Sequence, residues 1–156
     1  SQIVSASGAS AGIGFAVSVA TVQRVVPQLV AKGHYPHPWL GVQMLELNAE
    51  RSAALRKAGA DIPVDEGLLI AEMVDGGPAQ KAGLQAGSDT VTIGNAHIPV
   101  DGDIIVAING TPVTTSQELM VYLETNTQVG DTVHVNVVRD GEEHVISIQL
   151  TERTQE

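Results

Sequence analysis

Five histidines are the side chains of this sequence that could bind a metal ion or exchange protons near neutral pH. His34 and His37 lie three residues apart, but Pro36 and Pro38 keep that stretch out of a regular helix, and no pair of carboxylates accompanies it. The other three are scattered over predicted strands: His97, His134 and His144. We therefore interpret all five as solvated side chains and predict neither a metal site nor a catalytic histidine.

Three further patterns could indicate chemistry, and each lacks a necessary part. The N-terminal serines have no neighbouring base motif, which argues against a nucleophile: Ser5, Ser7 and Ser10. The glycine spacing over 8–14 is similar to a dinucleotide-binding loop, but it precedes a predicted strand instead of joining a strand to a helix. The acidic loop with Asp61, Asp65 and Glu66 lacks the ligand spacing of a calcium loop. The sequence consequently predicts no catalytic residue, no cofactor and no metal.

The overall composition narrows the class of protein further. Hydrophobic residues make up 43% of the 156 residues and charged residues 17%, which indicates a globular chain. A net charge of −10 without any basic run excludes binding to a nucleic-acid backbone and disfavours anionic membrane surfaces. Because there are no cysteines, disulfide scaffolds, zinc ribbons and thiol nucleophiles are excluded.

The first 33 residues are predicted to form one short strand over 13–17 and one helix. The apolar residues of the helix recur at helical spacing: Val22, Val25, Val26, Leu29 and Val30. Pro27 should kink this helix and Gly33 should end it. A strand and one helix cannot bury an apolar stripe alone. We therefore expect the segment to pack on the rest of the chain or to swap with a neighbouring chain.

A second unit begins at Trp39, after a stiff proline-containing connector over 34–38. Apolar runs bounded by turn residues predict strands over 40–47, 67–74, 89–93, 96–100, 104–108, 132–139 and 142–150. Helices are predicted over 49–58, 78–83 and 116–126. Asn48 should cap the first of them. Short strands interrupted by short helices predict an α+β fold that is mainly β, a small, partly open barrel or sandwich capped by the helices.

Several local patterns occur in an order that is informative as a whole. They are Gly12–Val17 with Thr21–Leu29, Trp39-Leu40-Gly41-Val42, Gly77–Leu84, Gly102–Gly110, the 116–126 helix and Val129-Gly130-Asp131. Together they resemble the end of the trypsin-like protease domain and the PDZ domain of the HtrA/Deg family of serine proteases. The resemblance covers nearly the whole chain. It implies a remnant of the protease domain over 1–33, a linker over 34–38 and a PDZ domain over 39–153.

The sequence departs from this family pattern in three places. Ser18 and Ala20 stand where the family usually has proline and a capping polar residue. Residues 88–100 are an insertion, expected to form a hairpin that either decorates the domain or shades part of its groove. The segments that would carry the catalytic Ser, His and Asp are absent. The chain as given is therefore not expected to be an enzyme, although the full-length parent resembles a serine endopeptidase.

The resemblance also implies a peptide-binding groove that works by strand addition. The Trp39–Val42 segment would be the loop whose backbone N–H groups hold a peptide carboxylate, and the strand after it would receive the peptide. The helix face formed by Ser116, Met120 and Leu123 would be the opposite wall. The predicted peptide-binding residues are Trp39, Leu40, Gly41, Val42, Gln43, Met44, Ser116, Met120 and Leu123. Two alternatives stay open: the loop is only the start of a strand, or Leu119, Met120 and Leu123 are all core.

The function implied by the resemblance is recognition of C-terminal or extended peptides of unfolded proteins for an HtrA-like endopeptidase in protein quality control. Its partners would be such peptides and the parent's own protease domain, which trimerises in this family, with no nucleic acid. The location would be extracytoplasmic, in the periplasm or cell envelope of a bacterium. One alternative is a stand-alone PDZ scaffold without a protease role, against which the match at Gly12–Leu29 argues. Another is a PDZ-bearing peptidase with Ser–Lys chemistry, for which the chain has no room.

Overall fold

A computed structural model describes residues 36–153 of the chain. The chain divides between Pro36 and His37 into two units, and residues 37–153 belong to the second. The strand and helix predicted within residues 1–33 lie outside the described residues.

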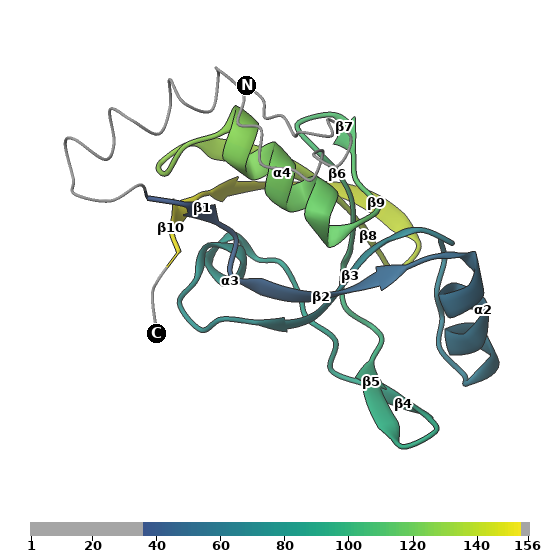
Figure 1. The fold of residues 1–156 in the computed structure, drawn as a ribbon. Coiled ribbons are helices and arrows are strands. Elements are labelled where there is room, and N and C mark those ends of the chain that lie inside the picture. The colour runs from purple at the N-terminus through teal and green to yellow at the C-terminus, as the bar shows by residue number, and fades with distance from the viewer. Residues whose placement is uncertain (1–35, 154–156) are drawn as a thin grey trace, which may run out of the picture. The chain divides into compact units, whose positions relative to one another are not determined.

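An antiparallel sheet forms the centre of this unit, and β2 lies at its edge (Figure 1). Its strands follow the order β2-β3-β6-β8-β9, and β7 pairs with β6 beside this path. The bounds are β2 Val42–Leu47, β3 Gly67–Met73, β6 Ile104–Ile108, β7 Thr111–Pro112, β8 Thr132–Arg139 and β9 Glu142–Gln149. The described sheets are open, so the predicted mainly β, partly open α+β fold is confirmed.

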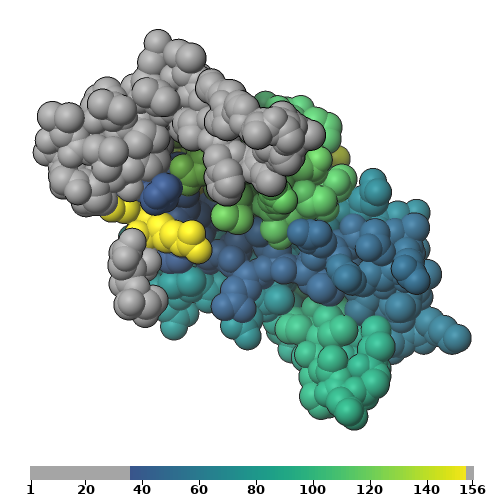
Figure 2. Space-filling model, viewed as in Figure 1, coloured from purple at the N-terminus to yellow at the C-terminus, as the bar shows by residue number. Residues whose placement is uncertain are grey.

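Two short ladders stand apart from the central sheet. β1 (Pro38–Trp39) pairs with β10 (Thr151–Glu152), so the first and last described strands lie side by side. β4 (Thr90–Ile93) pairs with β5 (Ala96–Pro99) in the hairpin predicted within 88–100. Figures 1 and 2 show this hairpin projecting from the body of the unit.

Local sequence signals explain where the three described helices begin and where α3 ends. In α2 (Ala49–Lys57), the Asn48 side chain accepts a hydrogen bond from the Arg51 N–H at 2.7 Å, as the sequence predicted. α3 (Pro78–Ala82) starts with proline and ends at Gly83, whose left-handed φ of 93° favours glycine. α4 (Ser116–Asn126) opens with a capping box between Thr115 and Glu118.

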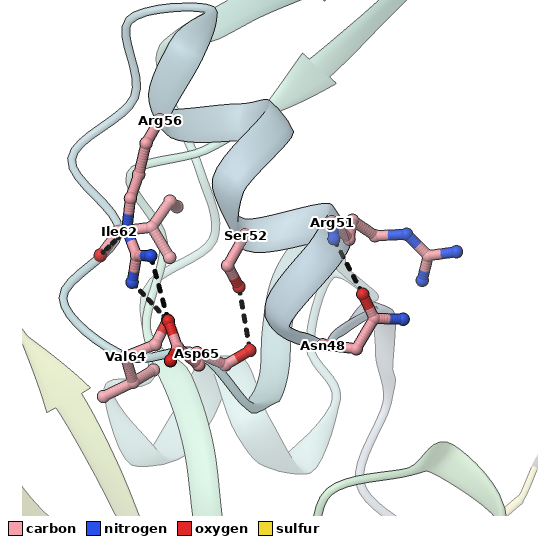
Figure 3. Close-up of polar contacts among 7 residues, drawn as sticks. All are labelled: Asn48, Arg51, Ser52, Arg56, Ile62, Val64 and Asp65. Atoms are coloured by element: carbon pink, nitrogen blue, oxygen red, sulfur yellow. Dashed lines mark hydrogen bonds and ion pairs between the residues drawn. The ribbon is translucent and has the colours of Figure 1, made fainter.

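Polar contacts attach α2 to the loop that follows it (Figure 3). Arg56 donates hydrogen bonds to the carbonyl oxygens of Ile62 and Val64 and forms an ion pair with Asp65 at 2.9 Å. The buried Ser52 hydroxyl donates to the Asp65 carbonyl oxygen at 2.9 Å. These bonds satisfy the backbone of an irregular loop, which therefore needs no strand partner.

The core consists of two apolar clusters on opposite faces of the central sheet. One cluster joins α3 and α4 to the sheet through residues such as Leu68, Ile105 and Leu119. The other joins β2 and β3 to α2 and to the inserted hairpin, through Leu47 and Leu55 among others. Because Leu45 packs against the second cluster and Met44 against the first, β2 has one face toward α4 and the other toward the hairpin.

Five predicted strands are shorter in the structure, four of them by one residue and the strand predicted from Leu40 by two. The strand predicted from Leu40 begins at Val42, because the carbonyl oxygens of Leu40 and Gly41 accept hydrogen bonds from Ala79 and Val74 outside the sheet ladder. The pairing of β1 with β10 was not predicted. Among the described residues, no helix is long and apolar enough to cross a membrane.

Candidate functional site

A groove lies between the β1–β2 segment and α4, with a cavity of about 140 Å³. Seven of the nine predicted site residues line it: Trp39, Leu40, Gly41, Val42, Met44, Met120 and Leu123. Five residues that were not predicted complete the lining: His37, Pro38, Leu119, Glu124 and Arg153. Gln43 and Ser116 were predicted as site residues but do not line this cavity.

At one end of the groove, a short loop presents backbone N–H groups. Gly41 has a φ of +78°, and a Cβ built on it would lie 3.3 Å from Pro78 Cδ, so the loop conformation favours glycine. The carbonyl oxygens of Leu40 and Gly41 accept bonds from Ala79 and Val74, both at 2.9 Å. Within residues 36–153, the N–H groups of Leu40 and Gly41 donate no hydrogen bond. Two adjacent uncommitted N–H groups can bind an anion.

Along the groove, β2 offers a sheet edge to an added strand. In the described sheet β2 pairs only with β3, so the groups on its other edge have no strand partner there. The β2–β3 register shifts between Gln43 and Met44, where one strand bulges. Met44 faces the groove, whereas Gln43 is exposed. An extended chain could therefore pair with this edge while its side chains alternate between groove and solvent.

The opposite wall is the face of α4, and it combines core and exposed apolar residues. Leu119 and Leu123 are 1% and 5% exposed and belong to the core cluster, so both form the floor of the groove. Met120 is 52% exposed, which excludes the alternative that all three residues are core. A flexible, exposed methionine beside an apolar floor suits side chains of varied shape.

The first turn of α4 is fixed to β2 and to its own capping residues. The Ser116 N–H donates to Glu46 Oε2 at 2.9 Å, so Ser116 joins helix and strand without lining the cavity. Hydrogen bonds from the Thr114 backbone and hydroxyl, and from the Thr115 backbone, hold the pKa of Glu118 below its usual value. The charged carboxylate therefore persists at the positive end of the helix, and the wall of the groove keeps its position.

Charged side chains gather where the groove meets the β1–β10 ladder. His37 Nδ1 lies 2.9 Å from Glu124 Oε2, which joins the segment before β1 to the last turns of α4. The Arg153 N–H donates to the His37 carbonyl oxygen at 2.8 Å, and Arg153 also lines the cavity. Glu124 lies four residues after Met120, so helical spacing could have identified it. Nothing local in the sequence could have placed Arg153 in the groove.

The other sequence candidates do not assemble into a site. His134 Nδ1 lies 2.9 Å from the Ser147 hydroxyl, and His97 Nδ1 lies 3.2 Å from the Thr92 hydroxyl, all on exposed strand surfaces. In the described part of the chain, no three His, Asp or Glu residues are grouped as metal ligands would be. Ser5, Ser7, Ser10 and His34 lie outside the described residues.

The inserted hairpin contributes no residue to the lining of the groove. Its Ile93 and Ile98 instead border a hollow with Leu45 and residues of α2, on the other face of β2. Successive β2 side chains point to opposite faces, so Met44 lies in the groove and Leu45 in the hollow. The hairpin that borders Leu45 is therefore on the face away from the groove. Of the two expectations for residues 88–100, decoration describes this arrangement and shading of the groove does not.

Comparisons with known proteins agree with this architecture. The PDZ domain family matches residues 38–150. The serine protease Do-like HtrA of Bacillus subtilis (strain 168) is 32% identical over 146 residues, which cover 91% of this chain and 29% of that protein. A DegP-like periplasmic serine endoprotease of Ectopseudomonas mendocina (strain ymp) is 31% identical over 150 residues, covering 96% and 27%.

A solved structure supports the fold. The HtrA3 PDZ domain bound to a phage-derived ligand (FGRWV) superimposes with a TM-score of 0.54 at 24% identity, covering 72% of this chain and 84% of that one. At this identity the likeness shows the fold alone. The chain spans less than a third of the length of the two curated relatives above.

Proposed function

Because the chain belongs to the PDZ domain family, we propose that its groove binds extended peptides by adding them as a strand to β2. The observation that carries the proposal is the outer edge of β2, which has no strand partner within residues 36–153 and runs from the N–H groups of Leu40 and Gly41 along an apolar floor. The N–H groups receive the carboxylate of a C-terminal peptide. Its last side chain enters the pocket bordered by Val42 and Leu123.

Peptide selectivity follows from the character of the lining. Leu40, Leu119 and Leu123 form a buried apolar floor, so an apolar last side chain gains free energy by leaving water. Met120 stands at the rim and adapts to branched or unbranched side chains. Gln43, exposed on β2, is a peptide contact outside the pocket, and Ser116 borders the upstream end of the helix wall.

The biological role is substrate recognition for an HtrA-like serine endoprotease in protein quality control. Two relatives named as serine proteases support it, although each extends well beyond this chain. In this assignment residues 1–33 belong to the protease domain, 34–38 form a linker and 39–153 form the PDZ domain. The parent acts outside the cytoplasm, in line with the periplasmic name of one relative, and trimerises through its protease domain.

The test is a titration with peptides that end in an apolar residue, each made as a free acid and as a C-terminal amide. The single tryptophan, Trp39, lines the groove, so its fluorescence reports binding directly. We expect micromolar binding of the acids, a loss of about tenfold or more in the Met120→Glu variant, and an unchanged circular dichroism spectrum. Met120 is the appropriate position because it is exposed, whereas Leu40 is 3% exposed and a charge there would disrupt the core.

Two outcomes would refute the proposal. If no peptide in the set changes the fluorescence of the folded domain, the groove does not recognise peptides. If peptides bind equally well to the wild type and to Met120→Glu, they bind somewhere other than this groove.

A further inference from the structure

Among the arginines of residues 36–153, Arg153 differs from the others because its side chain has no hydrogen-bond or ion-pair partner within those residues. Arg51 donates to the Glu46 carbonyl oxygen, and Arg56 is engaged by the loop after α2. Arg139 forms a buried ion pair with Asp103. No group within residues 36–153 forms a hydrogen bond or ion pair with the Arg153 guanidinium, so none of them competes with a ligand for its five donors.

The backbone nevertheless holds Arg153 in a defined place. β10 ends at Glu152, which pairs with Pro38, and the next N–H, that of Arg153, donates to the His37 carbonyl oxygen at 2.8 Å. Arg153 therefore follows directly on a ladder whose other strand leads into the Leu40–Gly41 loop. Its side chain lines the same cavity as that loop, although the two lie at opposite ends of the unit's sequence.

The negative charge of the chain, and of Glu124 in the groove, would oppose binding of an anionic ligand unless a cation lies nearby. The chain carries a net charge of −10, which repels an anionic ligand at long range. Glu124 lines the same cavity and is paired with His37 at 2.9 Å. Apart from His37, Arg153 is the basic residue of the lining, so it is the group able to offset a bound negative charge.

We propose that Arg153 is the counter-ion for the terminal carboxylate of the peptide and thereby makes the groove selective for free C-termini. This inference rests on the proposed peptide-binding function and names a specificity residue within it. The N–H groups of Leu40 and Gly41 bind the carboxylate at short range, and the guanidinium approaches its outer oxygen lone pairs from the rim. Because the guanidinium is planar and presents paired donors, lysine should replace it only in part.

The experiment compares acid and amide forms of one peptide on four proteins. These are the wild type, Arg153→Gln, Arg153→Lys and, as a control with the same loss of charge, Lys57→Gln. Lys57 lies in the last turn of α2 and lines no part of the groove. In Arg153→Gln we expect the affinity for the acid to fall about fivefold, as for an ion pair at a partly solvated rim, with little change for the amide.

The remaining proteins sharpen the comparison. Arg153→Lys should keep part of the preference for the acid, and Lys57→Gln should keep all of it. Raising the salt concentration should weaken binding of the acid to the wild type more than to Arg153→Gln, because screening acts on the ion pair.

Each contrary outcome has a separate meaning. If Arg153→Gln retains the full preference for the acid, the backbone loop alone binds the carboxylate, and the inference is wrong while the proposed function stands. If Arg153→Gln weakens acid and amide equally, the residue supports the β1–β10 ladder and is not a counter-ion, which also overturns the inference. If neither form binds to the wild type, the proposed function itself fails.

Discussion

Replacing Arg139 by methionine should lower the free energy of unfolding by about 3–5 kcal/mol. The Asp103 side chain is 1% exposed, and its carboxylate accepts hydrogen bonds from Arg139 Nε and Nη2, both at 2.8 Å, and from the Gln85 N–H at 2.9 Å. Removing the guanidinium leaves a buried negative charge with one hydrogen bond. Such a charge is far more costly in the folded protein than in water.

The size of the effect follows from the bonds that are lost. Two charge-assisted hydrogen bonds contribute about 1.5–3 kcal/mol each, and a third, weaker bond from Arg139 Nη2 to the Gly83 carbonyl oxygen is 3.1 Å long. Methionine keeps most of the aliphatic packing, which limits the loss. The hydrogen bonds to Asp103 raise the pKa of Arg139 above its ordinary value. The stabilisation contributed by the charge of Arg139 is therefore fully present below the unfolded-state pKa of the guanidinium, and it is lost as the pH rises through the higher folded value.

The assay is urea-induced unfolding followed by far-ultraviolet circular dichroism, with two companion variants. Combining Arg139→Met with Asp103→Asn removes the unpaired charge but keeps an acceptor for the Gln85 N–H, so it should recover about 2 kcal/mol. Asp65→Asn serves as the control because the Arg56–Asp65 pair is also 2.9 Å long but its side chains are 40% and 63% exposed. That substitution should cost less than about 1 kcal/mol.

The reasoning would be refuted by a loss in Arg139→Met no larger than that in Asp65→Asn. It would also be refuted if Asp103→Asn failed to restore stability in the Arg139→Met background. Either result would mean that burial of the carboxylate does not govern the energy of this pair.

Three further predictions concern the loop, the helix wall and the inserted hairpin. Gly41→Ala should weaken peptide binding by about tenfold, because a side chain at φ +78° costs about 1–2 kcal/mol and displaces the N–H groups; a titration of the folded variant measures this. Thr115→Ala should cost about 1 kcal/mol in urea unfolding by removing the α4 cap, whereas Thr115→Ser should cost little. Hydrogen bonds from the Asp89 backbone, and then from the Ser88 hydroxyl and backbone, lower the pKa of Asp101. Its stabilising contribution is thus present above the unfolded pKa of about 3.9 and is lost as the pH falls through the lower folded value. The protection factors of the Ser88 and Asp89 amides against hydrogen exchange should therefore fall in acid. Unchanged protection at low pH would contradict this.

Most of the elements could be predicted because their signals are local. Asn109-Gly110 and Asp140-Gly141 adopt positive φ at both residues, which is what two-residue hairpin turns require of those dipeptides. The Asn48 cap and the proline at the start of α3 likewise act on the backbone next to them. Signals of this kind are complete within a few residues and do not depend on the rest of the fold.

Those residues of the cavity lining that could be predicted from the sequence also have local signals. The spacing of Met120 and Leu123 on one helix face, and the run from Trp39 to Val42, are readable from the sequence. Gln43 is exposed and does not line the cavity, because alternation along β2 turns its side chain away from it, so its contact with a peptide stays a prediction. Arg153 could not be found, because its position depends on a two-residue ladder between distant parts of the chain, for which short sequences carry no signal.

That ladder also determines how the domain would respond to tension. The chain enters at His37 and leaves at Arg153, and the two meet at the same end of the β1–β10 pair. A pull on the two ends would therefore break the hydrogen bonds one after another, as in opening a zipper, and would not load them all together. The next segments to be peeled away would be the Leu40–Gly41 loop on one side and Leu150 with the end of β9 on the other. Tension on the two ends would thus disturb the loop that lines the peptide groove early in unfolding, because this loop follows directly on β1.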